Sequence, residues 1–261
     1  MYDEMEVKIS GKYLVEVLAA MDEPIVVLGG WAVRFLVNDR YRENTGRDYL
    51  GSRDIDLGFH ITGDIENSAF AKAMGTLERH LGFINQSFRF FKETHSETGV
   101  VLTVDEAKKL PPYLIFPMYV DLIVDTIPPG FKERFGFSPI DEPLIVSIFT
   151  DGKNRIVREE FGKTLWLPTA ELMLAMKVKS HPSREKEHKR VKDICDITAI
   201  LLFGTLSGEK VWPDGHLSPE DVEKFRKAIT RKDTAEAAGI IGIDASIVEN
   251  AFARFGLAPI D

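Results

Sequence analysis

The stretch IVVLGGWAV at residues 25–33 contains a wholly apolar strand, Ile25–Leu28, followed by a turn at Gly29-Gly30 and an apolar helix over residues 31–37. The stretch SRDIDLGF at residues 52–59 alternates polar with apolar side chains, which is typical of a strand with one face in a core. A strand, a turn, a helix and a second strand in this order predict a domain of mixed α and β structure.

Working outward, the apolar pattern predicts further helices and strands up to about residue 165. An apolar stripe at Tyr13, Leu14, Val17 and Leu18 predicts an N-terminal helix. The polar segment Asn38 to Ser52 is expected to be a loop, and residues 66–81 a helix. Strands are expected at residues 83–91, 98–104 and 114–125, and in a hairpin over 143–167 that turns at Asp151-Gly152.

Strand signals end at Pro168, after which the chain predicts helices only. Helices are expected through Lys179, over residues 191–203, and from Ser218 onward, with a basic loop between the first two. The chain is therefore predicted to be an α+β protein, with an α/β domain at residues 1–165 and an all-helical domain at 168–261.

Composition indicates a folded chain and excludes several classes. The 261 residues are 44% hydrophobic and 28% charged, which is ordinary for globular proteins. The N-terminus MYDEMEVKISGKY carries acids where a signal peptide carries bases, and no stretch approaches a membrane span, so a cytoplasmic protein with no membrane partner is expected. The net charge of −8 disfavours whole-surface binding to nucleic acid.

The single cysteine, Cys195, excludes an intramolecular disulfide and any zinc site with several cysteines. A lone thiol in an apolar stretch is expected to be a small buried hydrophobe.

Acids within apolar strands are the feature that calls for a chemical explanation. Asp54 and Asp56 are two apart on one strand, so both carboxylates project from the same face. Asp121 lies in the most apolar strand, where an ionised group is costly to bury unless it is paired or bound to metal. Asp125 is four residues after Asp121 and so lies on the same strand face. It stands beside the Pro128-Pro129-Gly130 break, where an exposed strand-end acid is expected.

Carboxylates on neighbouring strands form the oxygen-donor site that Mg²⁺ prefers, with room left for waters and phosphates. Gly29-Gly30, between a strand and a helix, would let backbone N–H groups meet a phosphate. Together they indicate phosphoryl or nucleotidyl transfer. Each feature also has a plain structural explanation, because D-x-D arises by chance and Gly-Gly is also a simple tight turn.

The segments LGGWAV at 28–33, SRDIDLGF at 52–59 and YVDLIV at 119–124 resemble the three-part signature of the DNA polymerase β-type nucleotidyltransferase fold. The later segments LPTAELMLAMKVKS and KRVKDICDITAIL are similar to the lysine and aspartate motifs of the AbiEii-like or MenT-like nucleotidyltransferases of toxin–antitoxin systems. The resemblance covers roughly residues 25 to 203 and implies a polymerase-β-like domain, with a mixed sheet and flanking helices, followed by a helical region.

This resemblance implies roles for particular residues. Gly29, Gly30 and Trp31 would contact the triphosphate of a nucleoside triphosphate, and Asp54 and Asp56 would hold Mg²⁺ or Mn²⁺. Asp121 would complete the metal site and help activate an acceptor hydroxyl. The remaining implied nucleotide contacts are Lys177, Asp193 and Arg184.

Several of these residues also have ordinary explanations. Lys177 can extend its ammonium group to solvent from an apolar helix, and Asp193 and Asp196 can be surface acids of a helix. The basic segment 181–190 suits either an anion, such as a triphosphate or an RNA backbone, or a solvated connector. The Asn38 to Ser52 segment lengthens the spacing from Gly30 to Asp54 beyond the usual one, and either covers the site or is a solvated loop.

The sequence thus predicts a metal-dependent nucleotidyltransferase that moves a nucleoside monophosphate group to an acceptor hydroxyl on tRNA or RNA, protein or a small molecule. The alternatives are a non-catalytic nucleotide-binding or RNA-binding protein, or toxin–antitoxin partner, of the same fold, and a D-x-D glycosyltransferase. The last is disfavoured because its acid pair normally follows a longer nucleotide-binding half. The sequence does not select the acceptor or the oligomeric state.

Overall fold

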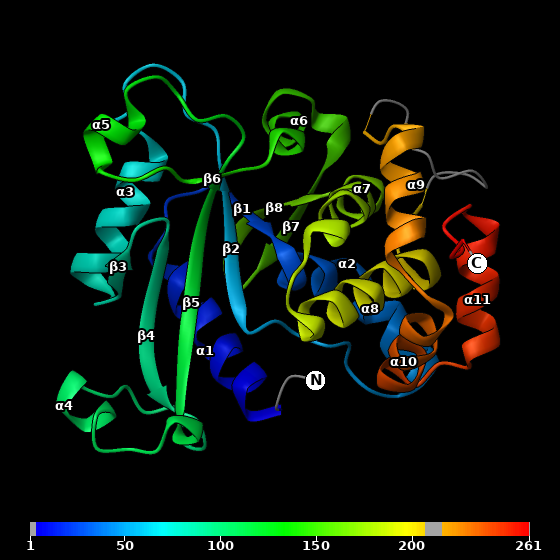
Figure 1. Ribbon diagram of the computed structural model, residues 1–261. Helices are drawn as coiled ribbons and strands as arrows, with labels where there is room; N and C mark the ends of the chain where they lie inside the picture. The colour runs from blue at the N-terminus through cyan, green and yellow to red at the C-terminus, as the bar shows by residue number, and fades with distance from the viewer. Residues whose placement is uncertain (1–3, 207–215, 261) are drawn as a thin grey trace. The chain divides into compact units, whose positions relative to one another are not determined.

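The computed structural model places β2 (Asp54–Phe59) at the centre of a mixed sheet (Figure 1). β1 (Ile25–Leu28) runs antiparallel to β2 on one side, and β5 (Ile115–Val124) runs parallel to it on the other. β4 (Arg89–His95) continues the sheet antiparallel to β5, and β8 (Lys163–Pro168) pairs parallel with β1. The acid-bearing strand is therefore flanked on both sides.

The structure describes residues 4–206 and 216–260. In this part of the chain the strand order is β3-β4-β5-β2-β1-β8-β7, with β6 paired to β5. The outer strands are β3 (Ile84–Gln86), β6 (Ile140–Asp141) and β7 (Arg155–Glu160). None of the described helices is both long and apolar enough to cross a membrane.

The chain divides into two compact units. The sheet unit contains residues up to 31 and residues 51–167, and the helical unit contains residues 32–50 and the chain from residue 168 onward. The sequence divides the chain into contiguous domains at 1–165 and 168–261, whereas here residues 32–50 group with the C-terminal residues.

The helices of the sheet unit are short apart from the first. α1 (Glu4–Ala20) buries the expected stripe of Tyr13, Leu14, Val17 and Leu18, and it packs on β2 and β5. Ser68 caps α3 by accepting a hydrogen bond from the backbone N–H of Ala71. The other helices of this unit are α3 (Ala69–Gly75), which continues as a π-helical turn at Thr76–His80, α4 (Val104–Ala107), α5 (Phe131–Phe135) and α6 (Val146–Thr150).

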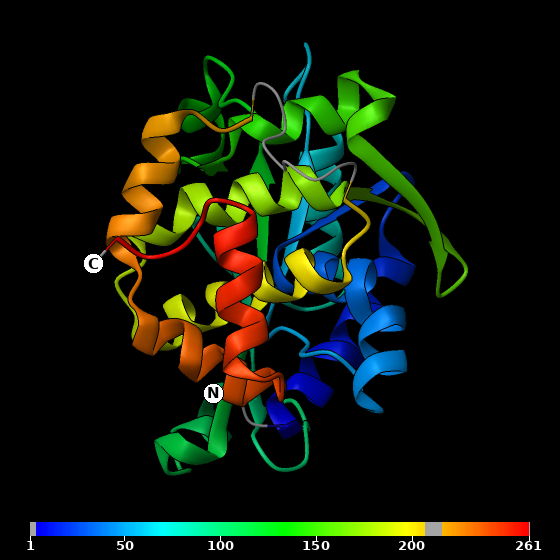
Figure 2. The same ribbon diagram turned by 90° about the vertical axis from the view of Figure 1, so that its right-hand side faces the viewer.

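The helical unit contains most of α2 (Gly29–Thr45) and the C-terminal helices seen in Figure 2. α8 packs against α10 and α11, and α7 packs against α8 and α9. Thr169, Ser218 and Thr230 each accept a backbone hydrogen bond at a helix start, which explains where α7, α9 and α10 begin. The bounds are α7 (Ala170–Ser180), α8 (Glu187–Phe203), α9 (Pro219–Ala228), α10 (Arg231–Ile241) and α11 (Ala245–Arg254).

The predicted α+β class is confirmed: a mixed sheet with flanking helices is followed by a helical C-terminal region. The helices predicted over residues 66–81 and 191–203 and the strand at 114–125 are also confirmed, although α8 begins at Glu187 inside the predicted basic loop.

The prediction of a loop from Asn38 to Ser52 is wrong in its first half, because α2 continues to Thr45. Tyr41 is 1% exposed and its ring lies edge-on to Phe203. This buried aromatic contact stabilises the helical conformation of an otherwise polar stretch. Thr45 also donates its hydroxyl hydrogen bond to the Tyr41 carbonyl one turn earlier. Packing therefore overrides the weak helix propensity of this stretch.

Two strand predictions are also wrong. Residues 98–104 form only a single bridge, Thr94 to Val101, because Thr103 already caps α4. The hairpin before residue 168 turns at Phe161-Gly162 rather than at Asp151-Gly152. Phe161 and Gly162 both have positive φ angles, as a tight hairpin turn requires. The stretch before it forms a 3₁₀ turn and α6, since Glu142 accepts a hydrogen bond from the Leu144 backbone N–H and Pro143 starts the turn.

Phe131 at the start of α5 gives a test of the packing in the sheet unit. Its side chain is 1% exposed, and its ring lies 5.2 Å from Phe70 and 4.7 Å from Phe135 between centroids. We expect Phe131→Ala to lower the free energy of unfolding by about 3–5 kcal/mol, measured by urea denaturation with circular dichroism. Tyr113→Ala, at a side chain 78% exposed, should change it by less than about 0.5 kcal/mol; equal losses would contradict this packing.

Candidate active site

Three carboxylates lie on one face of the sheet, on the neighbouring strands β2 and β5. Asp54 and Asp56 share a face because side chains alternate along a strand. Asp121 is the register partner of Asp56 in the parallel pair, so its side chain projects from that same face. Asp54 and Asp56 are half-buried, and Asp121 is only 4% exposed. The structure therefore places the three acids that the sequence singled out on one face of two neighbouring strands.

Gly29 lies directly against the Asp56 carboxylate. A Cβ built on Gly29 would lie 1.8 Å from Oδ2 of Asp56, and the φ angle of Gly29 is +61°. Only glycine suits this position, because any side chain would collide with the carboxylate and strain the backbone. Gly30 follows, buried, in the first turn of α2. The N-terminal N–H groups of a long helix thus begin beside the acids, which is the arrangement that binds phosphate.

Trp31 lies next to these glycines but its indole is committed elsewhere in the sheet unit. Nε1 donates a hydrogen bond to the Ser10 hydroxyl at 3.2 Å, and the ring is 6% exposed and packs on Gly51. A contact of Trp31 with a triphosphate would therefore involve its backbone.

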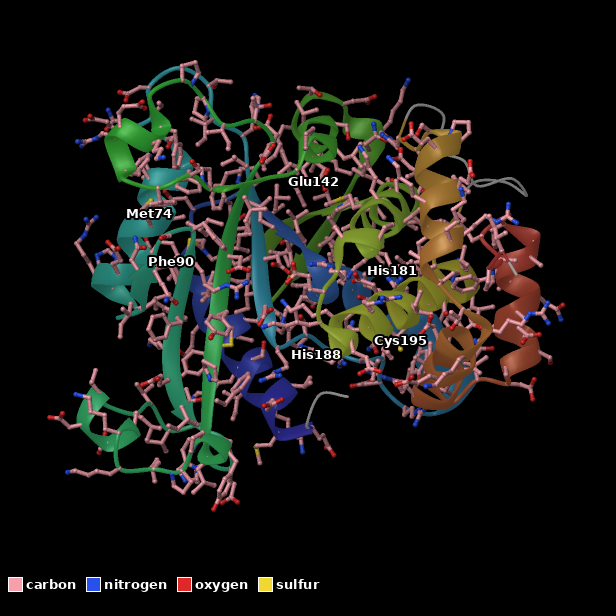
Figure 3. The ribbon with its side chains drawn as sticks, in the orientation of Figure 1. Met74, Phe90, Glu142, His181, His188 and Cys195 are labelled. Carbon is pink, nitrogen blue, oxygen red and sulfur yellow. The ribbon has the colours of Figure 1, made fainter. Side chains whose placement is uncertain are left out.

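Arg89 is the residue of this site that sequence reasoning missed. Its Nε and Nη2 donate to Oδ1 and Oδ2 of Asp121 at 2.7 and 2.5 Å, in a bidentate pair across β4 and β5. The hydrogen bond to Asp121 raises the pKa of Arg89, and the charges of Asp54 and Asp56 act in the same direction. The available signal was an arginine inside the aromatic run Phe88 to Phe91; Phe90, labelled in Figure 3, is its neighbour on β4.

The donor set suits a hard divalent cation, because it consists of carboxylate oxygens beside a helix N-terminus. In the described part of the chain, however, no three His, Cys, Asp or Glu side chains are gathered as a ready metal site. At this cluster, both oxygens of Asp121 accept hydrogen bonds from Arg89. Arg89 thus places one internal positive charge beside the three carboxylates.

Asp125 does not match the expectation of an exposed strand-end acid. It is 3% exposed, its Oδ2 lies 2.6 Å from Nδ1 of His60, and its Oδ1 accepts a hydrogen bond from the Thr126 backbone N–H. The His60 ring stacks on Phe149 with 5.5 Å between centroids. This pair stands four residues beyond Asp56 and Asp121 along their strands, at the far ends of β2 and β5, so it is separate from the acid cluster.

Lys177 lies in the helical unit at the centre of a buried ionic cluster with Asp193, Asp196, Arg184 and Lys192. Its Nζ lies 2.7 Å from Oδ1 of Asp193 and 2.8 Å from Oδ2 of Asp196. Arg184 donates through Nε to Asp193 at 2.9 Å, and Lys192 pairs with Asp196. Neither the solvent-exposed lysine nor the surface acids considered from the sequence are found.

The electrostatics of this buried ionic cluster favour the charged forms of Lys177 and Asp193. Burial alone would lower the pKa of Lys177, but the carboxylates of Asp193 and Asp196 outweigh it and raise that pKa. Burial alone would raise the pKa of Asp193, but Lys177 and Arg184 outweigh it and lower that pKa. As placed, these side chains bond to one another, so nucleotide contact by Lys177, Asp193 or Arg184 stays a prediction.

Arginines in or beside the 181–190 and 38–52 segments also bond to other groups of the helical unit. Arg190 donates to the Ala228 carbonyl at 2.6 Å, and Arg34 and Arg42 both pair with Asp48. Tyr49 donates its hydroxyl to Asp196 at 2.8 Å, which adds a neutral donor to the buried ionic cluster.

His181 and Cys195, both labelled in Figure 3, are buried titratable groups of the helical unit. His181 is 1% exposed, its ring lies edge-on to Phe225, and neither ring nitrogen has a hydrogen-bond partner among the described residues. Burial lowers the pKa of His181 to about 4. Burial raises the pKa of Cys195 to about 12, as expected for an inert thiol.

No protein-family model matches the chain, and no curated protein matches it. Among solved structures, it is similar to an antigenic nucleotidyltransferase-like protein from Paracoccidioides brasiliensis. The sequence identity is 15% and the TM-score 0.42, over 94% of this chain and 92% of that chain. A likeness of this degree leaves the functional argument to the residues of the site itself.

Gly29→Ala tests the contact with Asp56. We expect a loss of about 1–2 kcal/mol in the free energy of unfolding from the positive φ alone, and a further loss because Asp56 must move. Gly63→Ala is the matched control, since its φ is +72° and nothing lies within 4 Å of the added Cβ. Urea denaturation measures both, and equal losses would show that Asp56 does not press on Gly29.

His181 should make stability depend on pH. The unfolded imidazole takes up a proton below its ordinary pKa of 6.5, whereas the folded one does so only near 4. The free energy of unfolding should therefore rise with pH across this window, by on the order of 2 kcal/mol. We expect His181→Phe to flatten this rise in urea titrations at several pH values, and His80→Gln, at an exposed position, to leave it intact.

Proposed function

We propose that this protein is a metal-dependent nucleotidyltransferase that moves a nucleoside monophosphate group from a nucleoside triphosphate to an acceptor hydroxyl and releases pyrophosphate. The observation that carries the proposal is the placement of Asp54, Asp56 and Asp121 on one sheet face beside Gly29 at the start of α2. The segments that resemble the polymerase β-type signature are the ones that supply these residues.

Each part of this arrangement has a role in the proposal. The backbone N–H groups of Gly29 and Gly30 would bind the anionic phosphates, aided by the positive end of the helix dipole. Asp54 and Asp56 would be the principal ligands of Mg²⁺ or Mn²⁺. When bound, such an ion neutralises the charge that develops on the transferring phosphate and the leaving group.

Asp121 would orient the acceptor hydroxyl toward the α-phosphorus. The acceptor oxygen forms its bond to that phosphorus as the bond to the pyrophosphate oxygen breaks, and the hydroxyl proton passes to a carboxylate or to water. Both oxygens of Asp121 are engaged by Arg89, so Asp121 would serve chiefly to position groups as long as that pair is intact.

The acceptor class is left open by the acid cluster, which selects the reaction and not the second substrate. Two later segments of the sequence are similar to motifs of the AbiEii or MenT type of toxin–antitoxin nucleotidyltransferase, and tRNA or RNA, protein and small molecules are the acceptors to test. The non-catalytic alternative is favoured by one observation, the bidentate Arg89–Asp121 pair, which occupies a carboxylate that catalysis would use.

The test is transfer of labelled nucleotide by Asp56→Asn. Because this change removes a charged ligand and keeps the shape of the side chain, we expect transfer to fall by at least about 100-fold with the fold intact. Asp22→Asn, at an exposed acid of the same unit, should keep full transfer.

The assay uses each labelled nucleoside triphosphate with tRNA, protein and small alcohols, and it follows pyrophosphate release. Normal transfer by Asp56→Asn would refute the mechanism. Nucleotide binding without product in the unaltered protein would support the non-catalytic alternative, and release of a nucleoside diphosphate from a nucleotide-sugar would support the glycosyltransferase.

A further inference from the structure

Arg89 places a permanent positive charge among the three acids of the proposed metal site. Its side chain is 27% exposed, while the Asp121 side chain that it grips is 5% exposed. Asp121 therefore has little water to stabilise its charge, and the guanidinium takes that role.

The position of Arg89 is fixed from several sides. It is the register partner of Asp121 in the antiparallel pair of β4 and β5, so its side chain leaves the sheet on the acid face. The guanidinium carbon lies 4.6 Å from the centre of the Tyr119 ring, which stands opposite Asp54 in the register. A stacked, bidentate arginine is a specific contact that lysine cannot reproduce.

A divalent cation and Arg89 would both bind the carboxylate oxygens of Asp121. An ion held by Asp54 and Asp56 meets an Asp121 whose two oxygens already accept hydrogen bonds from the guanidinium, so the two cations compete for the charge of one carboxylate. Two cations on one carboxylate also repel each other, so binding of one weakens binding of the other.

We infer that Arg89 is a built-in competitor of the divalent metal: it binds Asp121 in the metal-free protein, and its hydrogen bonds to that carboxylate weaken binding of the ion there. This inference rests on the proposed function, because that proposal assigns the three acids to a metal. It adds that Arg89, which would not be a metal ligand, would lower the affinity of the site for metal.

The experiment measures Mn²⁺ affinity without nucleotide, by electron paramagnetic resonance of free Mn²⁺, for four proteins: the unaltered chain, Arg89→Gln, Asp121→Asn and the double variant. Competition for Asp121 predicts that Arg89→Gln tightens Mn²⁺ binding about tenfold when Asp121 is present. In the Asp121→Asn background the same change should have little effect, because the contested carboxylate is gone.

Two further variants sharpen this comparison. Arg89→Lys keeps the charge but loses the bidentate fork, so it should give an intermediate affinity. Arg134→Gln breaks another arginine–carboxylate pair of the sheet unit, Arg134 with Glu66 at 2.7 Å, and should leave Mn²⁺ affinity unchanged. Near-ultraviolet circular dichroism establishes that each variant is folded; if Arg89→Gln is not, Arg89→Lys alone carries the test.

The outcomes separate the two proposals. An equal gain in affinity in both Asp121 backgrounds would mean that Arg89 acts only through its charge, and this would overturn the inference. Unchanged or weaker binding by folded Arg89→Gln or Arg89→Lys would overturn it as well. If no protein of the set binds Mn²⁺, the metal site itself fails, and the proposed function fails with it. If the predicted pattern appears without any nucleotide transfer, the inference stands and only the proposed activity is refuted.

Discussion

Mutual repulsion of carboxylates is the constraint around which the sheet unit is organised. Asp54, Asp56 and Asp121 leave the same face of neighbouring strands, and Asp121 is nearly out of contact with water. Such a group is stable only if a cation accompanies it. The cation is Arg89, on the neighbouring strand β4. Asp56 has room because Gly29, beside it, has no Cβ. Arg89 and Gly29 therefore accommodate the carboxylates within the protein itself, without any ligand.

The helical unit meets the same constraint with a different balance. Asp193 and Asp196 are buried among three cations, Lys177, Lys192 and Arg184, and Tyr49 adds a hydroxyl donor. In this cluster three cations accompany two carboxylates, whereas in the described part of the sheet unit one cation, Arg89, accompanies the three carboxylates. By formal charge, the cluster in the helical unit therefore carries surplus positive charge and the cluster in the sheet unit surplus negative charge.

The sequence predicted the parts of this structure that depend on local pattern. The apolar strand at residues 25–28, the alternation around Asp54 and Asp56, and the capped helices from Thr169 onward follow from periodicity and turn chemistry. It missed Arg89 because its role depends on which strand lies beside β5, and an antiparallel partner with that register is not encoded locally. The helical continuation to Thr45 was missed for a similar reason, since Tyr41 is held by contacts with residues more than 150 positions away.

The single cysteine has a practical consequence. Cys195 has no exposed surface, and burial raises the pKa of its thiol to about 12. Maleimides and other thiol reagents react with exposed thiolates, so the folded chain presents them with no reactive sulfur. A cysteine introduced at any chosen surface position would thus be labelled alone. Spin labels or fluorophores can be placed on either unit without first removing a native residue.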